Sequence, residues 1–208
     1  MQALVTTDWL AGELGKPDVV VFDATKYLPN EPKDGSAEFR AAHIPGARYF
    51  DIDEVADVRW RALPVASKPA PYSPNRESPM PGDNVALVIE DRCTGRSAVY
   101  APGLAAIDER LWGFMRAASC VLVDGTFWSD DEMVRVGVSG KRARDIGHLP
   151  QSGPGGMLEQ LDRLPAGVRK ILIHINNTNP ILDELSVEFG ELERRGVEVA
   201  EDGMEISL

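Results

Sequence analysis

The chain has 208 residues, 43% of them hydrophobic, which is enough to bury one sizeable core or two small ones. Its formal net charge of −11 argues against general binding to nucleic acid or to an anionic membrane surface, because the field of the protein would repel phosphate groups. The two cysteines, Cys93 and Cys120, are too few for a disulfide framework or a four-cysteine zinc cluster. With no signal-peptide pattern and no apolar run of bilayer length, we expect a cytoplasmic protein without membrane insertion.

The first 57 residues predict short helices alternating with strands. "TTDWLAGEL" (6–14) places capping residues before an apolar-periodic run, which is typical of a helix start. "DVVVFDA" (18–24) predicts a short buried strand. "SAEFRAAHIPGARYFDID" (36–53) predicts a helix that is stopped at Pro45 and followed by another strand.

A proline-rich segment, "ALPVASKPAPYSPNRESPMPGD" (62–83), predicts an extended loop with no regular helix. Alternating elements follow it. We expect strands at 84–91, 97–103, 120–125 and 169–176, helices at 106–118, 129–137, 153–164 and 183–196, and a closing pair of short strands within 197–208. The pattern predicts an α/β or α+β fold with helices covering the sheet.

The first segment, residues 1–57, resembles the start of the rhodanese superfamily, near the N-terminal half-domain of 3-mercaptopyruvate sulfurtransferases. The resemblance rests on "LVTTDWLAGELGKPDVVVFDATKYLP" and "AEFRAAHIPGARYFDID". In that superfamily this region is structural and supplies no persulfide-forming cysteine. The resemblance therefore implies that His43, in "AAHIPGA", is a packing or turn residue.

The second segment, residues 58–208, resembles the C-terminal half of the PqqB family of pyrroloquinoline quinone (PQQ) biosynthesis proteins, within the metallo-β-lactamase superfamily. The matching stretches, in family order, are "ASKPAPYSPNR", "GDNVALVIEDRCTGR", "YAPGLAAID", "VDGTFWSDDEM", "GHLPQSGPGG", "IHINNTNPILDE" and "DGMEISL". This resemblance implies the C-terminal half of an αββα sandwich, preceded by the partial rhodanese-like β/α segment.

The two resemblances give Cys93 different roles. A sulfurtransferase needs its cysteine loop to lead into a helix whose N-terminus stabilises the thiolate. Here the loop "RCTGR" is followed by the strand-like "SAVYAPG", which favours a hairpin turn. We therefore expect Cys93 to be a turn residue without sulfur-transfer activity, and Cys120 to be a small core residue.

The PqqB-like resemblance implies a metal site. Asp124 in "VDGTFW" and His174 in "IHINN" lie where the superfamily places an acidic and a histidine ligand at strand ends, and these side chains suit zinc or iron. His148, in "GHLPQSGPGG", is the candidate acid/base or third ligand. Taken singly, each residue is also compatible with a turn, a cap or a hydrogen-bonded core position.

Substrate-binding candidates lie close to these three residues in the sequence. Asn176, Asn177, Thr178 and Asn179 crowd next to His174 and could orient it or bind the substrate. Ser152, Gly153, Gly155 and Gly156 offer backbone amides to an anionic group.

The superfamily's histidine-rich N-terminal motif is absent from residues 1–57, so we expect a divalent metal, iron or zinc, to be held weakly. The resemblance implies metal-dependent oxidation or hydroxylation of the tyrosine-derived part of the PQQ precursor peptide, or carriage of PQQ or a related small molecule. The alternatives are a rhodanese-type sulfurtransferase and a non-enzymatic fusion remnant. A half-sandwich would also expose an apolar sheet face, which predicts self-association.

Overall fold

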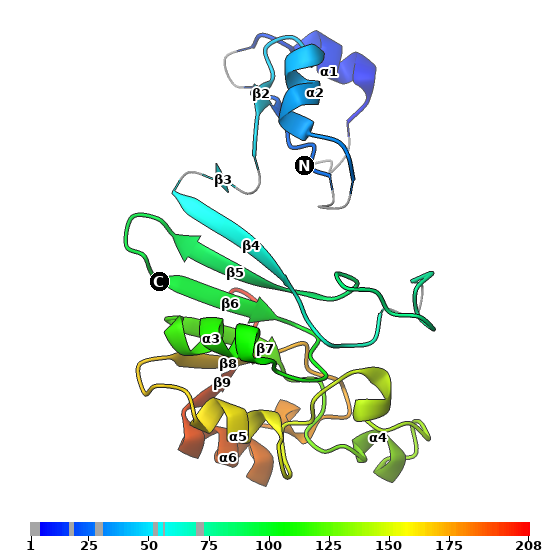
Figure 1. Cartoon of the computed structure of the whole chain (residues 1–208), viewed down its shortest axis with the longest axis vertical. Coiled ribbons are helices and arrows are strands. Elements are labelled where there is room, and N and C mark those ends of the chain that lie inside the picture. The colour runs from blue at the N-terminus through cyan, green and yellow to red at the C-terminus, as the bar shows by residue number, and fades with distance from the viewer. Residues whose placement is uncertain (1–4, 17–18, 28–30, 52–53, 56, 70–72) are drawn as a thin grey trace. The chain divides into compact units, whose positions relative to one another are not determined.

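The computed structural model describes residues 5–16, 19–27, 31–51, 54–55, 57–69 and 73–208, and the chain divides into two compact units, Met1–Val58 and Arg59–Leu208 (Figure 1). Within the described residues, no helix is both long enough and apolar enough to cross a membrane.

The first unit contains two short helices and short strands. Its elements are α1 (Thr7–Glu13), β1 (Phe22–Asp23), α2 (Gly35–Ala41), β2 (Arg48–Tyr49) and β3 (Glu54–Val55). The side chains of Thr6 and Asp34 cap α1 and α2 by accepting backbone N–H groups, which is why the helices begin where the sequence predicts.

The strand predicted at 18–24 is shorter than expected and is not buried. Only Phe22 and Asp23 pair with β2, in parallel, and the Phe22 side chain is exposed. Asp18 lies outside the described residues. His43 stacks on Phe39 with the ring centroids 4.1 Å apart, and its Nδ1 lies 2.7 Å from the Phe39 carbonyl oxygen. His43 is exposed, and its role as a packing or turn residue stays a prediction with which these contacts agree.

The second unit is a sheet with helices between its strands. Its elements are β4 (Val58–Pro64), β5 (Val85–Asp91), β6 (Ser97–Ala101), α3 (Glu109–Ala117), β7 (Cys120–Asp124), α4 (Glu132–Arg135), η1 (Arg144–Ile146), α5 (Met157–Asp162), β8 (Arg169–Ile173), η2 (Pro180–Leu182), α6 (Val187–Arg195) and β9 (Val197–Val199). The strands lie in the order β4-β5-β6-β7-β8-β9. β5 and β6 are antiparallel, whereas β6 to β9 run parallel to one another.

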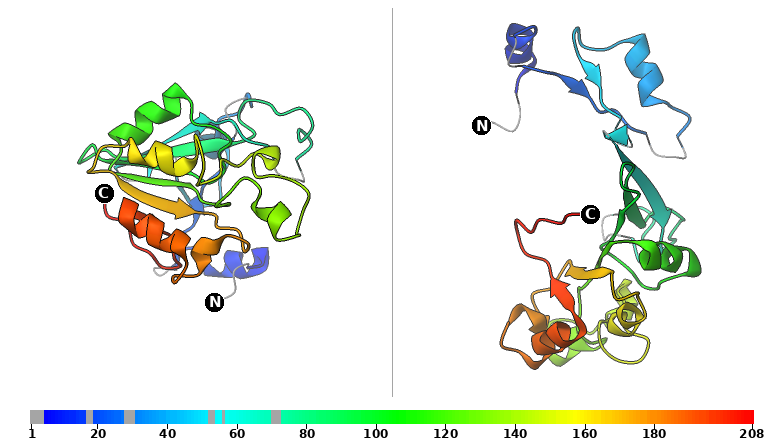
Figure 2. Two further views of the ribbon diagram at one scale, coloured as in Figure 1. Left: turned by 90° about the horizontal axis from the view of Figure 1, so that it is seen from below. Right: turned by 90° about the vertical axis from the view of Figure 1, so that its left-hand side faces the viewer.

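Alternate residues of the parallel strands face opposite sides of the sheet. Val121 and Val123 of β7 and Leu172 of β8 belong to the main core, which also contains residues of α3, α5 and α6. Figures 1 and 2 show these helices packed along the sheet. The mixed α/β fold predicted from the sequence is confirmed.

Part of the opposite side of the sheet is covered by the end of the chain. Cys120 and Ile171 on this side pack with Met204, Ile206 and Leu208. Residues 200–208 form a turn and an irregular tail, so the second of the two predicted closing strands is wrong. Because the tail covers part of this face, the face is less open than a bare half-sandwich would be, and self-association stays a prediction.

The hairpin predicted around Cys93 is confirmed. β5 and β6 pair with Glu90 opposite Ser97, and the side chain of Asp91 accepts the backbone N–H of Cys93 at 2.8 Å within the turn. Cys93 is exposed, and its loop leads into β6. The loop therefore lacks the helix N-terminus that would stabilise a thiolate. Cys120 is buried, as expected.

Candidate metal centre

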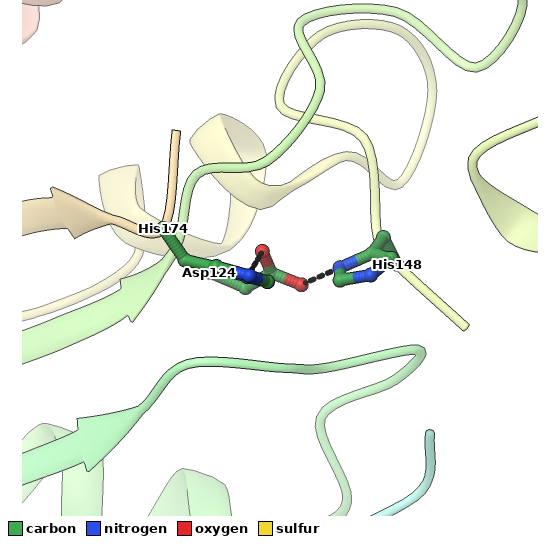
Figure 3. A group of neighbouring side chains, drawn as sticks. All are labelled: Asp124, His148 and His174. Carbon is green, nitrogen blue, oxygen red and sulfur yellow. Dashed lines mark hydrogen bonds and ion pairs between the residues drawn. The ribbon is translucent and has the colours of Figure 1, made fainter. Parts of the chain in front are cut away.

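Asp124 and His174 meet because they end neighbouring parallel strands. Asp124 is the last residue of β7 and lies opposite Ile173, the last residue of β8, so His174 follows directly at the same edge of the sheet. The apolar, β-branched runs before both residues bury the strands and bring their ends together. Figure 3 shows the two side chains with His148, which comes from a separate loop.

The Asp124 carboxylate is fully buried and accepts hydrogen bonds at both of its oxygens. Its Oδ2 accepts the Leu104 N–H at 3.0 Å, and its Oδ1 accepts the backbone N–H of Thr126 at 3.1 Å and the Thr126 hydroxyl at 2.5 Å. Burial alone would raise the pKa of Asp124, but its interactions with His148, His174 and Thr126 outweigh burial and lower the pKa to about 2. The carboxylate is therefore ionised at neutral pH.

His148 is the closest imidazole to this carboxylate. Its Nδ1 lies 2.6 Å from Asp124 Oδ2, and its ring packs edge-on against Phe127 at a centroid distance of 5.7 Å. The loop that carries it is held by the backbone bond from Leu149 N–H to the Leu104 carbonyl. Only 16% of the His148 side chain is exposed. With Nδ1 facing a carboxylate, Nε2 is the ring nitrogen left for another partner.

His174 adopts a left-handed backbone conformation with a φ of 58°, which is uncommon for a residue with a side chain. Its Nδ1 lies 3.0 Å from both the Pro102 carbonyl oxygen and the Thr126 hydroxyl, and 3.9 Å from Asp124 Oδ1. The interaction with Asp124 raises the pKa of His174, and partial burial opposes that rise. The side chain is 58% exposed and so remains open to solvent.

The three residues fit a divalent metal ion in both chemistry and position. One carboxylate oxygen and two imidazole nitrogens, all within 4.8 Å of one another, form the group among the described residues that could hold an ion. Zinc and iron accept this combination of ligands. The structure thus brings together Asp124, His148 and His174, and the cluster could bind a divalent metal.

The predicted substrate-binding residues lie in different environments. Ser152 donates its hydroxyl to the Trp128 carbonyl at 2.7 Å and lines a separate hollow that also contains Glu159 and Glu191. The amide of Gly155 already donates to Glu159, at 2.8 Å. The hollow also contains Arg195, and the backbone amides of Ser152 and Gly156 donate to the carbonyls of Trp128 and Gly153, so anion binding by this loop stays a prediction.

The asparagines after β8 also differ from one another. Asn179 is buried, and its Nδ2 donates to the Gly125 carbonyl at 2.9 Å while its Oδ1 accepts the Ile181 N–H at 3.2 Å. Asn176 donates to the Thr178 hydroxyl at 2.5 Å, and Asn177 is exposed. Asn179 therefore holds the loop together, and substrate contact by any of the three stays a prediction.

Sequence reasoning missed two residues that organise the centre. Thr126 lies between Asp124 and His174 and contacts both. Glu132 is buried and accepts the Trp128 N–H at 2.6 Å and the Thr178 hydroxyl at 2.5 Å, which ties the loops after β7 and β8 together. Thr126 could have been identified from its position two residues after Asp124, whereas no local sequence pattern marks Glu132.

Comparison with known proteins gives a family match and close relatives. The model of the Beta-lactamase superfamily domain matches residues 35–175. Coenzyme PQQ synthesis protein B of Azoarcus sp. is 59% identical over 79% of this chain and 54% of its own length. The protein of the same name from Cupriavidus necator is 59% identical over 76% of this chain and 52% of its own length.

The solved structure of Zn²⁺-bound PqqB from Methylobacterium extorquens is similar as well. It is 30% identical with a TM-score of 0.62, and the match covers 78% of this chain and 52% of that one. The chain thus spans about half the length of the relatives it matches.

The matches extend into the segment with the rhodanese resemblance. The family match starts at residue 35, and the protein of the same name from Pseudomonas putida is 52% identical over 175 residues, or 84% of this chain and 57% of its own length. Residues 58–208 number only 151, so that alignment includes part of residues 1–57. The rhodanese-like origin of the first segment and its boundary at residue 57 stay predictions.

Proposed function

The chain belongs to the β-lactamase superfamily, and from that premise we propose that it carries the metal-binding C-terminal half of a coenzyme PQQ synthesis protein B. The proposed activity is metal-dependent oxidation of the tyrosine-derived part of the PQQ precursor peptide, for which dioxygen would be the external oxidant. The observation that carries this proposal is the Asp124, His148 and His174 cluster in a chain 59% identical to a protein of that name.

Asp124 and His174 are the proposed metal ligands, and His148 is the proposed third ligand or acid/base. A divalent ion bound here would supply a Lewis acid beside the cavity that His148 and His174 line. Asp124 holds the His148 ring by its Nδ1, which leaves Nε2 to accept or release a proton at the substrate. Thr126 and the Pro102 carbonyl orient the His174 ring in the same way.

Three ligands bind an ion less tightly than a fully closed site, and so the proposal includes weak, exchangeable metal binding. The test is titration of the metal-free chain with Zn²⁺ and Fe²⁺ by calorimetry, with metal content measured after gel filtration. We expect one ion per chain, and weakening of binding by about 10- to 100-fold in Asp124→Asn and His174→Asn.

The matched control is His43→Asn, because His43 is the remaining histidine and stacks on Phe39 in the first unit. We expect its metal affinity to equal that of the unmodified chain. Equal affinity in all three variants would show that Asp124 and His174 are not ligands, and would remove the basis of the proposed function.

A further inference from the structure

A cavity of about 500 Å³ opens beside His148 and His174. The described residues that line it include Ser67, Lys68, Arg76, Lys141, His148 and His174. Three of the described lining residues are Lys or Arg and none is an acid, although the whole chain has 33 acidic residues against 22 Lys and Arg. The cavity is therefore a positive region in a strongly negative protein.

The backbone that carries Lys68 is fixed to the site. The Ala66 carbonyl accepts the Ala105 N–H at 2.7 Å, and the Ser67 hydroxyl donates to the Gly147 carbonyl at 2.7 Å. Gly147 directly precedes His148, and a Cβ at Gly147 would lie only 2.3 Å from the Lys68 backbone nitrogen. The backbone of Lys68 is therefore held in a fixed position next to the loop that carries His148.

Arg76 and Lys141 come from two other loops. Arg76 is half-buried in a turn that is held by the bond from Asn75 Nδ2 to Asp83 Oδ1 at 2.9 Å. Lys141 is exposed at the cavity edge, and its backbone N–H donates to the Ser139 hydroxyl at 3.1 Å.

Within the described part of the protein, no carboxylate neutralises the charge of these three cations. Nearby Arg142 pairs with Asp130 at 3.5 Å, whereas Lys68, Arg76 and Lys141 make no ion pair with a described residue. Three cations without an ion-pair partner that line one cavity leave it with excess positive charge, which a bound anion would offset.

We propose that this cavity binds a small molecule with two or more oxyanion groups, held by Lys68, Arg76 and Lys141, and presents it to His148 and His174. Arg76 offers the planar fork that suits a carboxylate or a phosphate, and the lysines supply point charges. A volume of about 500 Å³ lies within the usual range of small-molecule pockets. The identification of this molecule as the substrate rests on the proposed function, whereas its binding to the cavity needs no metal.

The experiment uses the metal-free full chain, freed of chelator by gel filtration because chelators are themselves polycarboxylates. Tricarballylate and pyrophosphate are titrated separately by calorimetry, at low and at high salt. We expect at least one of them to bind, with affinity that falls as salt rises, because exposed charges are screened. Binding of tricarballylate alone assigns the oxyanions as carboxylates, and binding of pyrophosphate alone assigns them as phosphates.

The variants Lys68→Gln, Arg76→Gln and Lys141→Gln should each weaken that binding by about tenfold, because each loses one charge-assisted hydrogen bond. Arg92→Gln is the matched control: it makes the same charge change in the exposed turn between β5 and β6, outside the cavity lining. We expect its affinity to stay within about twofold of the unmodified chain. Thermal unfolding of each variant checks that the fold is retained.

Absence of binding by both anions, or an equal loss in Arg92→Gln, would overturn the inference. Zn²⁺ titration of the same proteins separates it from the proposed function. Lost anion binding with intact Zn²⁺ uptake is a failure of the cavity inference alone. Intact anion binding without Zn²⁺ uptake is a failure of the metal site alone.

Discussion

Nδ1 of His148 lies 2.6 Å from Oδ2 of Asp124, across 24 positions of the chain, and the same carboxylate lies 3.9 Å from Nδ1 of His174. One fully buried negative charge thus positions both imidazoles. The backbone N–H groups of Leu104 and Thr126 hold that charge in place, so the centre is organised by the protein itself.

Replacement of Thr126 by Val removes the hydroxyl that contacts both Asp124 and His174 while it keeps the side-chain volume. We expect the free energy of unfolding to fall by about 1–3 kcal/mol, because a buried carboxylate oxygen loses a donor. We also expect Zn²⁺ affinity to fall by about tenfold, because the His174 ring loses a constraint. Urea unfolding and calorimetry measure the two effects, and Thr126→Ser should restore both. A Thr126→Val protein with unchanged Zn²⁺ affinity would argue against a positioning role.

Asn179 and Asn177 lie close together in the sequence but should differ in their contribution to stability. Asn179→Ala leaves the carbonyls of Gly125 and Thr126 without the side-chain donor, so we expect a loss of about 2–3 kcal/mol in unfolding free energy. Asn177 is exposed, and Asn177→Ala should change stability by less than about 0.5 kcal/mol. Equal urea midpoints for the two variants would contradict this assignment.

The ends of β7 and β8 were predictable because both strands are apolar runs that stop at a polar residue. Asp124 and His174 therefore stood out, and the family resemblance implied their pairing. The contacts of Lys68 were not predictable, because they depend on the close approach of Ser67 to Gly147 across 80 positions of the chain. No local pattern encodes such an approach.

Errors at the two ends of the predicted sheet have different physical causes. The strand β4 was missed because its "VRWRALP" stretch is mostly exposed and carries two arginines. The tail was assigned a strand because Met204, Ile206 and Leu208 alternate with polar residues. That alternation does reflect one-sided packing against the sheet, but the tail makes no strand ladder.

The ion pair between Arg169 and Glu198 predicts a pH dependence of stability. Arg169 Nε and Nη2 donate to the two carboxylate oxygens at 2.7 and 2.8 Å, which lowers the pKa of Glu198 below its ordinary value of 4.5 despite partial burial. A carboxyl group with a lowered pKa stabilises the fold fully at pH values above its ordinary pKa. This stabilisation is lost as the pH falls through the lowered pKa.

We therefore expect Glu198→Gln to lower the free energy of unfolding by less than about 1 kcal/mol at pH 7, because the pair is partly exposed. The difference from the unmodified chain should shrink as pH falls from 5 to about 3. Urea unfolding at several pH values measures it. Glu193→Gln, at an exposed position of α6, is the control, and a Glu198→Gln difference that grows toward acid pH would contradict the prediction.

The loop that carries His148 lies against the segment that carries Lys68 at Gly147. Gly147 has a φ of 89°, and a Cβ there would lie 2.3 Å from the Lys68 nitrogen and 2.9 Å from the Ser67 hydroxyl oxygen. Gly147→Ala must therefore strain the backbone and push the two segments apart. We expect a loss of about 2–4 kcal/mol in unfolding free energy.

Gly137→Ala is the matched control, because Gly137 also has a positive φ, of 72°, but no atom lies within 4 Å of its Cβ position. It should cost about 1–2 kcal/mol, from backbone strain alone. The excess loss in Gly147→Ala measures the clash. Because that clash displaces Lys68 as well as His148, anion binding should weaken in Gly147→Ala and persist in Gly137→Ala. Equal stability losses in the two variants, with anion binding intact in both, would show that the packing of Gly147 against Lys68 does not hold the cavity.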